Sequence, residues 1–486
     1  MILLDPFSDL FSVFNRMHSV LLSIIVTYDT MMETENHYNN LWQSGGNMNN
    51  EIFEKQSPAR AYLKLSLPLV LSMVVTLIYN LTDTYFAAQT GSTAVVAGVS
   101  LCAPVFTFLM ALGNIGGQGG SSLISRLMGQ KKRDEARHVS AFCFYASLVT
   151  GIVIGIVMLV IRKPMVQLLG SDQDTMPHAL GYYTWLSIGA PAVLLSFIHS
   201  NLLRAEGMAK ESMIGTIMGA LVNIVLDPIF ISGLHMGAAG AAIASVIGYI
   251  CSVVYDLIIV MCKSSVLSVR PADIPVQKEQ VKDILSIGTP AALVNIMQSV
   301  SAILLNQSLL VYRSEKIAAM GIALKVNMIE TLVLTGFAYG GQPLFDYYCG
   351  AQDRNRFHQL FHFCSVFIIC MGIVLAGLEI VFAPSLVRVF MNTAEIVKDG
   401  AYMLRLQAVT MPLMRMITLI MIIFRAAGKA AAAFVPSLSR QGIVNVLVLF
   451  IAQKVLGYTG VIGSQAIADV ISMAIAIGLA MQEHLI

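Results

Sequence analysis

Charged residues are scarce in this chain of 486 residues. They make up 12% of it, against 56% apolar residues, and the mean hydropathy is +0.74. A soluble domain must cover its surface with polar groups, so a composition this apolar excludes one. Apolar stretches long enough to cross about 30 Å of hydrocarbon, at roughly 1.5 Å per residue, recur about twelve times. The sequence therefore predicts an all-α membrane protein with twelve transmembrane helices.

Motifs of nucleotide-driven and hydrolytic proteins are also missing. The only Gly-Lys pair, Gly428–Lys429, is followed by Ala430 and forms no phosphate-binding loop. Neither HExxH nor GxSxG occurs, so no metalloprotease or serine-type enzyme is indicated. The seven cysteines have no CxxC spacing, which predicts packing residues. We therefore expect no enzyme and no cofactor, and the net charge of +2 gives no sign of a nucleic-acid partner.

Lys and Arg are distributed unevenly between the two sides of the predicted membrane. One alternate set of loops carries 17 of them and the other set carries seven. The positive-inside rule places the first set and both chain termini in the cytoplasm, in a protein of the cell inner (plasma) membrane. The seven outward residues are Arg162, Lys163, Arg313, Lys316, Arg388, Lys398 and Lys454.

The two halves of the chain follow the same plan. GGSSLISRLMG at 119–129 matches GGQPLFDYYCG at 340–350, and RAEG at 204–207 matches RAAG at 425–428. Six helices per half return the chain to the bilayer in the same orientation, so the halves form parallel repeats about an axis along the membrane normal. We expect two six-helix bundles with a substrate cleft between them.

The expected domain boundaries follow from this plan. Residues 1–57 form an N-terminal extension predicted to be disordered, and Met48 is the hypothesised true first residue. The remaining parts are an N-lobe at 58–261, a cytoplasmic linker at 262–283 and a C-lobe at 284–486.

Two carboxylates fall inside apolar spans of the first half, at similar depth. They are Asp83 in NLTDTYF and Asp227 in NIVLDPIF. An Asp at the bilayer centre costs about 2.5–3.5 kcal/mol on insertion scales, so such a residue is a candidate functional group. Asn223 shares the helix face of Asp227, four residues before it. Pro228 has no N–H for the carbonyl of Ile224, so we expect a bend there that frees a carbonyl beside the carboxylate.

This combination of amide, carboxylate and loosened backbone is able to hold a proton or a dehydrated sodium ion. A carboxylate kept from water favours its neutral form, so it binds and releases a proton as its access to water alternates. The alternative interpretation is a structural polar cluster in which Asn223 and the backbone cap Asp227.

Charged residues also interrupt the spans of the second half. Lys325 and Glu330 fall on the expected eighth helix, with Glu330 about 18 Å from its outer end. Glu330 is a candidate contact for a cationic substrate or a partner of Lys325, although residues five apart share a helix face poorly. Asp256, Asp346 and Glu379 lie nearer to expected span ends, where solvation at the interface is the favoured interpretation.

From about Pro58 to its end, the chain resembles the multidrug and toxic compound extrusion (MATE) family. The resemblance implies a twelve-helix MATE-type fold and antiport of cationic or amphipathic drugs against protons or sodium, by rocker-type alternating access in a monomer within the lipid bilayer. The motifs that carry it are, in order, LPLVLSMVVTLIYNLTDTYF, RAEGMAK, NIVLDPIFI, GAAGAAIASVI and GGQPLFDYYCGAQDRNR.

The resemblance also implies site residues. In the DinF-like branch of the family, the ion site of the N-lobe matches Asp83, Asn223 and Asp227, which would also hold sodium if sodium is the coupling ion. Tyr182 and Ser245 are similar to its polar neighbours.

A second branch of the family carries its ion site in the other lobe. That site has a Glu on helix seven and an Asp on helix ten, but here the first position is Gln298 and helix ten has no acid. The N-lobe site is therefore the expected coupling site, and the C-lobe offers Gln298, Lys325 and Glu330 as a candidate substrate or polar site. The alternative function is a lipid-linked precursor flippase of the same superfamily. A channel or a receptor is not indicated, because the sequence shows no filter-like loop and no ligand domain.

Overall fold

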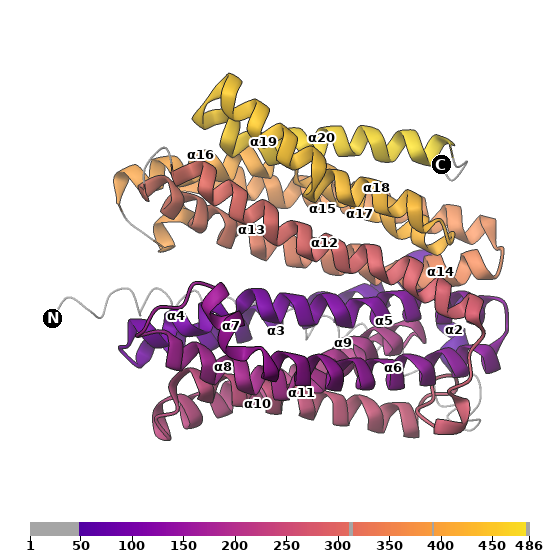
Figure 1. Cartoon of the computed structure of the whole chain (residues 1–486). Helices are drawn as coiled ribbons and strands as arrows, with labels where there is room; N and C mark the ends of the chain where they lie inside the picture. The colour runs from indigo at the N-terminus through magenta and orange to yellow at the C-terminus, as the bar shows by residue number, and fades with distance from the viewer. Residues whose placement is uncertain (1–47, 311–313, 391–392, 483–486) are drawn as a thin grey trace, which may run out of the picture.

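The computed structural model describes residues 48–310, 314–390 and 393–482, and these residues form helices without a single strand. Figure 1 shows two helical bundles lying side by side, the first built from the N-terminal half and the second from the C-terminal half. The first bundle contains α3 (Pro58–Gln89), α4 (Thr93–Leu101), α5 (Ala103–Gly129), α6 (Arg133–Val160), α7 (Arg162–Leu168), α8 (Met176–Ile188), α9 (Ala190–Ala205), α10 (Ala209–Asp227), the π-helix η1 (Pro228–Gly233) and α11 (Gly237–Cys262).

The second bundle begins after a connection that contains a short 3₁₀ turn, η2 (Pro271–Asp273). Its helices are α12 (Lys278–Leu310), α13 (Ser314–Gly340), α14 (Gln342–Gly350), α15 (Arg354–Phe390), α16 (Ala394–Ala408), α17 (Met411–Ala426), α18 (Ala430–Gln441), α19 (Ile443–Leu456) and α20 (Tyr458–Gln482). Nine helical segments of the described chain are long and apolar enough to cross a membrane, and the number rises to 11 with two bent pairs. The 33-residue α12 is long enough to be the twelfth span that the sequence predicts.

Two of the spans are bent where the sequence predicts single helices over 179–201 and 399–424. α8 and α9 meet at 54°, and α16 and α17 meet at 41°. Both breaks follow from proline, which lacks a backbone N–H and is tolerated only in the first turn of a helix. Pro191 opens α9 and Pro412 opens α17.

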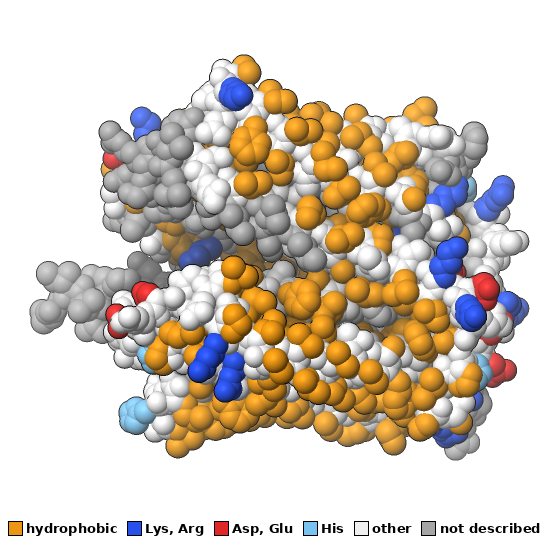
Figure 2. Space-filling view, viewed as in Figure 1, with side chains coloured by type: hydrophobic (Ala, Val, Ile, Leu, Met, Phe, Trp, Pro, Cys, Tyr) orange, Lys and Arg blue, Asp and Glu red, His pale blue; other side chains and the backbone are white. Residues whose placement is uncertain are grey.

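The outer surface of the molecule matches a bilayer environment. Figure 2 shows hydrophobic side chains over the middle of the visible face, with most of the charged side chains gathered at its two ends. Exposed apolar residues such as Val160, Val381 and Val455 belong to this surface. The chain is thus a multi-pass membrane protein whose lipid-facing belt runs around both bundles.

The two bundles pack tightly at the end where α5, α12 and α14 meet. The largest buried apolar cluster crosses between them there and includes Leu123 of α5, Ile284 of α12 and Phe345 of α14. The backbones approach so closely that a Cβ atom on Gly288 would lie 2.1 Å from the carbonyl oxygen of Ile115. At the opposite end, where α4 and α16 lie in Figure 1, Figure 2 shows a hollow between the bundles.

The N-terminal extension differs in part from its predicted disorder. Residues 1–47 lie outside the described residues, but the prediction of disorder is wrong for α2 (Met48–Glu54), which is a helix. It packs on the C-terminal bundle because Phe53 is fully buried and stacks on Tyr347, with ring centroids 4.6 Å apart. The hydroxyl of Tyr347 donates to Glu54 at 2.8 Å, and Arg356 donates to the Phe53 carbonyl at 2.7 Å.

The connection between the bundles is bound to the first bundle. Fully buried Glu206, just after α9, accepts hydrogen bonds from the backbone N–H groups of Ser265 at 2.8 Å and Val266 at 3.1 Å. Further along, Tyr145 donates to the Val269 carbonyl at 3.0 Å, and the His138 ring donates to the Asp273 carbonyl at 2.9 Å. Glu206 belongs to the RAEG motif, whose counterpart in the second half, RAAG, has Ala427 at this position.

Candidate functional site

The buried polar cluster of the N-terminal bundle centres on the last turn of α10. Asp227 is fully buried there and Asn223 is 2% exposed. The Asn223 amide donates to Asp227 Oδ1 at 3.3 Å and to Ser245 Oγ on α11 at 3.2 Å. The α-helix ends at Asp227, and Pro228 opens the π-helical turn η1, a type of distortion frequent at functional sites. The sequence predicts a bend at Pro228 that frees a carbonyl, and the structure has a π-helical turn at this place.

Asp83 on α3 completes the acidic part of this cluster. It lies close enough to Asp227 for the two carboxyl groups to interact electrostatically. Among the described contacts, buried oxygens of both residues, Asp83 Oδ1 and Asp227 Oδ2, have no hydrogen-bond partner, and neither does Asn223 Oδ1. The helices α3 and α10 thus bring two carboxyl groups and one amide together with unused acceptor capacity.

Tyrosines form the rest of the cluster. Tyr182 of α8 interacts electrostatically with both carboxyl groups, in agreement with its predicted place among the polar neighbours. The sequence analysis missed Tyr79 of α3, whose hydroxyl hydrogen-bonds with Ser245 and with Tyr249 of α11. Tyr79 and Tyr249 could both have been found from their spacing. Tyr79 precedes Asp83 by four residues and Tyr249 follows Ser245 by four, which places each pair on one helix face.

Such a cluster is suited to holding a small cation. Carboxylate, amide and hydroxyl oxygens are acceptors, and two adjacent buried carboxylates strongly disfavour being ionised together. A proton on one carboxyl group, or a cation between them, relieves both the repulsion and the missing hydrogen bonds. The site is enclosed by α3, α10 and α11, so its occupancy depends on how these helices pack.

A second buried polar cluster lies in the C-terminal bundle. The carboxyl groups of Glu330 on α13 and Glu379 on α15 are within hydrogen-bonding reach of each other, and both residues are buried. With the Asn327 amide nitrogen oriented toward Glu379, it donates to Glu379 Oε1 at 2.7 Å. Arg415 of α17 interacts electrostatically with Glu330 and donates to Thr335 Oγ1 at 2.8 Å.

The other predicted residues of the C-lobe site do not join this cluster. In the described structure the side chains of Gln298 on α12 and Lys325 on α13 are exposed, and Lys325 forms no ion pair with Glu330. Both lie on helix faces turned away from the buried interior. The structure therefore groups Glu330 with Glu379 instead of with Gln298 or Lys325.

Interfacial solvation is the wrong interpretation for three acids. Asp256 is 0% exposed, Asp346 is 1% exposed and Glu379 is 5% exposed. Their positions near span ends suggested solvent contact, but each faces another helix. Asp256 faces Arg204 of α9, and Asp346 accepts a hydrogen bond from α5 of the other bundle.

The fold and these buried polar sites define a membrane transporter. A model of the MatE family matches residues 68–229 and 290–451, two stretches whose starts lie 222 residues apart. The chain therefore belongs to the MatE family, which is a family of transporters and not of enzymes.

Comparison with known proteins gives the same result. The multidrug export protein MepA of Staphylococcus saprophyticus is 29% identical over 424 residues, covering 86% of this chain and 92% of that protein. MepA of Staphylococcus aureus (strain NCTC 8325 / PS 47) is 29% identical over 422 residues, again covering 86% of this chain and 92% of the relative.

Solved structures share the fold. A crystal structure of MATE in complex with MaL6 has a TM-score of 0.85 at 22% identity, covering 90% of this chain and 98% of that one. An outward-facing multidrug resistance MATE family transporter of the MOP superfamily has a TM-score of 0.84 at 23% identity, with the same coverage.

Proposed function

We propose that the protein is a secondary antiporter that exports organic cations or amphipathic drugs in exchange for protons. The observation that carries this proposal is the cluster of Asp83, Asn223 and Asp227, in which buried acceptor oxygens lack partners. Sodium is the alternative coupling ion, with the same three residues as its ligands. The multidrug export relatives support the choice of substrate class.

Coupling requires that the cluster meets water from one side at a time. In the proposed cycle, a proton enters from outside and binds at Asp83 and Asp227, which lets α3 repack against α10 and expels the substrate. The lobes then rock, and the proton leaves toward the cytoplasm. The hollow at one end and the close packing at the other support alternating access of this kind.

The membrane potential supplies enough energy for this exchange. One inward charge gains about 2.3 kcal/mol per 100 mV, which supports roughly a fifty-fold gradient of a neutral solute. A cationic substrate exchanged one for one cancels this electrical contribution and depends on the proton concentration gradient alone. We propose a monomer in the plasma membrane, with both termini in the cytoplasm, in line with the distribution of Lys and Arg.

The test is ethidium efflux from liposomes that contain the purified protein. A proton gradient and a sodium gradient are imposed separately, with the membrane potential clamped. We expect a proton gradient to drive efflux and a sodium gradient of equal size to leave it unchanged. Efflux driven by sodium alone would assign the three residues to a sodium site. No efflux under either gradient, with flipping of a lipid-linked precursor, would favour the flippase alternative.

A further inference from the structure

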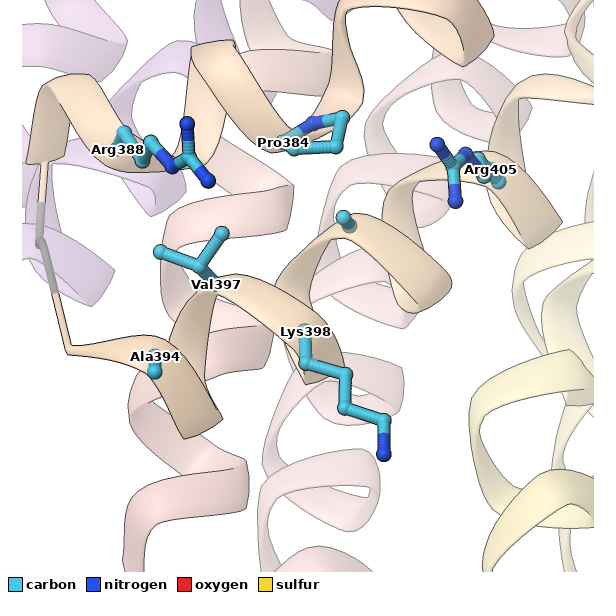
Figure 3. Close-up of a pocket in the computed structure, with 7 residues that line it drawn as sticks. Pro384, Arg388, Ala394, Val397, Lys398 and Arg405 are labelled. Atoms are coloured by element: carbon cyan, nitrogen blue, oxygen red, sulfur yellow. The ribbon is translucent and has the colours of Figure 1, made fainter.

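A basic cavity of about 700 Å³ lies between α15 and α16, at the end of the molecule expected to face outward. Figure 3 shows Arg388 and Arg405 on either side of Pro384. The contributions from α16 recur at the spacing of one helix face, so this whole face borders the cavity. The lining residues are Pro384, Arg388, Ala394, Val397, Lys398, Ala401 and Arg405, with no acid among them.

Arg405 is held in place by a consequence of Pro384. A proline inside a helix has no N–H for the carbonyl four residues earlier, which here is Ile380. The Nε–H of Arg405 donates to this Ile380 carbonyl at 3.1 Å. The proline of one helix thus creates the acceptor that fixes the arginine of the next helix, and the other guanidinium N–H groups remain available for a ligand.

Arg405 lies well inside α16 and needs a polar companion there. It lies eleven residues after the first residue of α16, which corresponds to a depth of about 16 Å along the helix. Its side chain is nevertheless exposed and not directed into the bundle. An exposed arginine at such depth is costly unless water or a negative charge accompanies it.

The surrounding charges point to the same kind of ligand. Arg388 and Lys398 are two of the seven Lys and Arg residues in the sparsely basic outward loops, so basic charge is concentrated here against the general trend. The nearby acid Asp399 interacts with Tyr458 of α20, on another face of α16. Basic pockets between transmembrane helices are typical binding sites for anionic lipid headgroups.

We propose that this cavity binds the phosphate group of an anionic phospholipid from the outer leaflet. Arg388 and Arg405 hold the phosphate from two sides, because a guanidinium group presents paired donors to phosphate oxygens. Lys398 adds a third positive charge at the rim. Val397, Ala401 and Pro384 provide the apolar wall along which an acyl chain lies. The bound lipid joins α15 to α16 at the outer end of the C-terminal bundle.

Native mass spectrometry of the delipidated full-length protein tests this proposal. Phosphatidylglycerol, phosphatidylcholine and inorganic phosphate are titrated separately. We expect phosphatidylglycerol to bind several-fold more tightly than phosphatidylcholine, and R388Q/R405Q to lose about tenfold of that affinity. The matched control is K454Q, which removes another exposed outward charge away from the cavity and should bind as the wild type does.

The single variant R388Q guards against misfolding, because Arg388 lies at the rim and its loss leaves the contact between Arg405 and Ile380 intact. We expect R388Q by itself to reduce the binding of phosphatidylglycerol. Equal binding of the two lipids, or unchanged binding by R388Q and by R388Q/R405Q, would overturn the proposal. Displacement of phosphatidylglycerol by millimolar inorganic phosphate would assign the cavity to free anions and would overturn the lipid assignment.

Discussion

Ser122 of the first bundle donates a hydrogen bond to Asp346 of the second at 2.8 Å, and both residues are buried. A similar contact lies nearby, where Arg425 of α17 donates to Gln118 of α5 at 2.6 Å. Polar contacts between the bundles thus accompany the close backbone packing at the expected cytoplasmic end. This end is sealed by specific hydrogen bonds as well as by apolar contact.

The first prediction concerns this seal. Ser122→Ala removes the donor to Asp346, whose other oxygen already lacks a partner. Leaving a buried acceptor unpaired costs about 1–3 kcal/mol, so we expect a lower melting temperature in detergent. Ser121→Ala is the matched control, because the Ser121 hydroxyl bonds only within its own helix, to the Gln118 carbonyl at 3.2 Å. Equal melting temperatures for the two variants would contradict a stabilising contact between the bundles.

The second prediction concerns the coupling site. Asp83→Asn and Asp227→Asn remove the groups proposed to take up the proton, so we expect proton-driven ethidium efflux to fall at least tenfold while membrane insertion is retained. Asp256→Asn is the control, because Asp256 is as buried as Asp227 and lies in the same bundle, but it faces Arg204. Efflux rates are compared at a clamped pH gradient. Wild-type efflux by either site variant would remove that carboxyl group from the mechanism.

The third prediction concerns the pair of Glu330 and Glu379. Two carboxyl groups in contact need a proton between them, so a neutral amide should replace one of them without loss of stability. We expect Glu379→Gln to melt within a few degrees of the wild type. Glu379→Ala removes the acceptor of Asn327 and the carboxyl group in contact with Glu330, which should cost about 1–3 kcal/mol. If the two variants have the same melting temperature, the two carboxyl groups do not depend on each other.

The fourth prediction concerns the backbone contact at Gly288. Gly288→Ala adds a Cβ atom 2.1 Å from the Ile115 carbonyl oxygen, which forces the bundles apart at this end. We expect a lower melting temperature and readier labelling of a cysteine introduced at Ile284, which is 3% exposed and belongs to the buried cluster between the bundles. Gly377→Ala is the control, because a Cβ atom there meets nothing within 4 Å. A Gly288→Ala variant with the melting temperature and the labelling rate of the wild type would contradict tight packing at this position.

The sequence predicted the N-terminal site because its signals are local. Asn223, Asp227 and Pro228 are close in the chain, and helical spacing alone places the first two on one face. Partners from other helices needed other signals: Asp83 was found by its similar depth, and Tyr182 and Ser245 through the resemblance to the MATE family. Glu379 was assigned to the interface because its distance from Glu330 is set by the packing of α13 against α15, which hydropathy does not encode.

Two further features, the helix α2 and the position of Arg405, were not predicted from the sequence. α2 has too few apolar residues to be recognised as ordered, and it is held by contacts of Phe53 and Glu54 with residues about 300 positions away. Arg405 lies inside an apolar span and was absent from the count of loop charges. Its position became meaningful only with the Ile380 carbonyl beside it.

The binding of the connection to the first bundle has a consequence for the proposed transport cycle. Glu206, Tyr145 and His138 hold it as far as Asp273, and α12 begins at Lys278. From Asp273 to the start of α12 the chain spans five residue steps, or about 18 Å at full extension. Near this connection the lobes cannot separate further unless the linker peels off α6, so in the proposed cycle the linker limits the width of the inward opening.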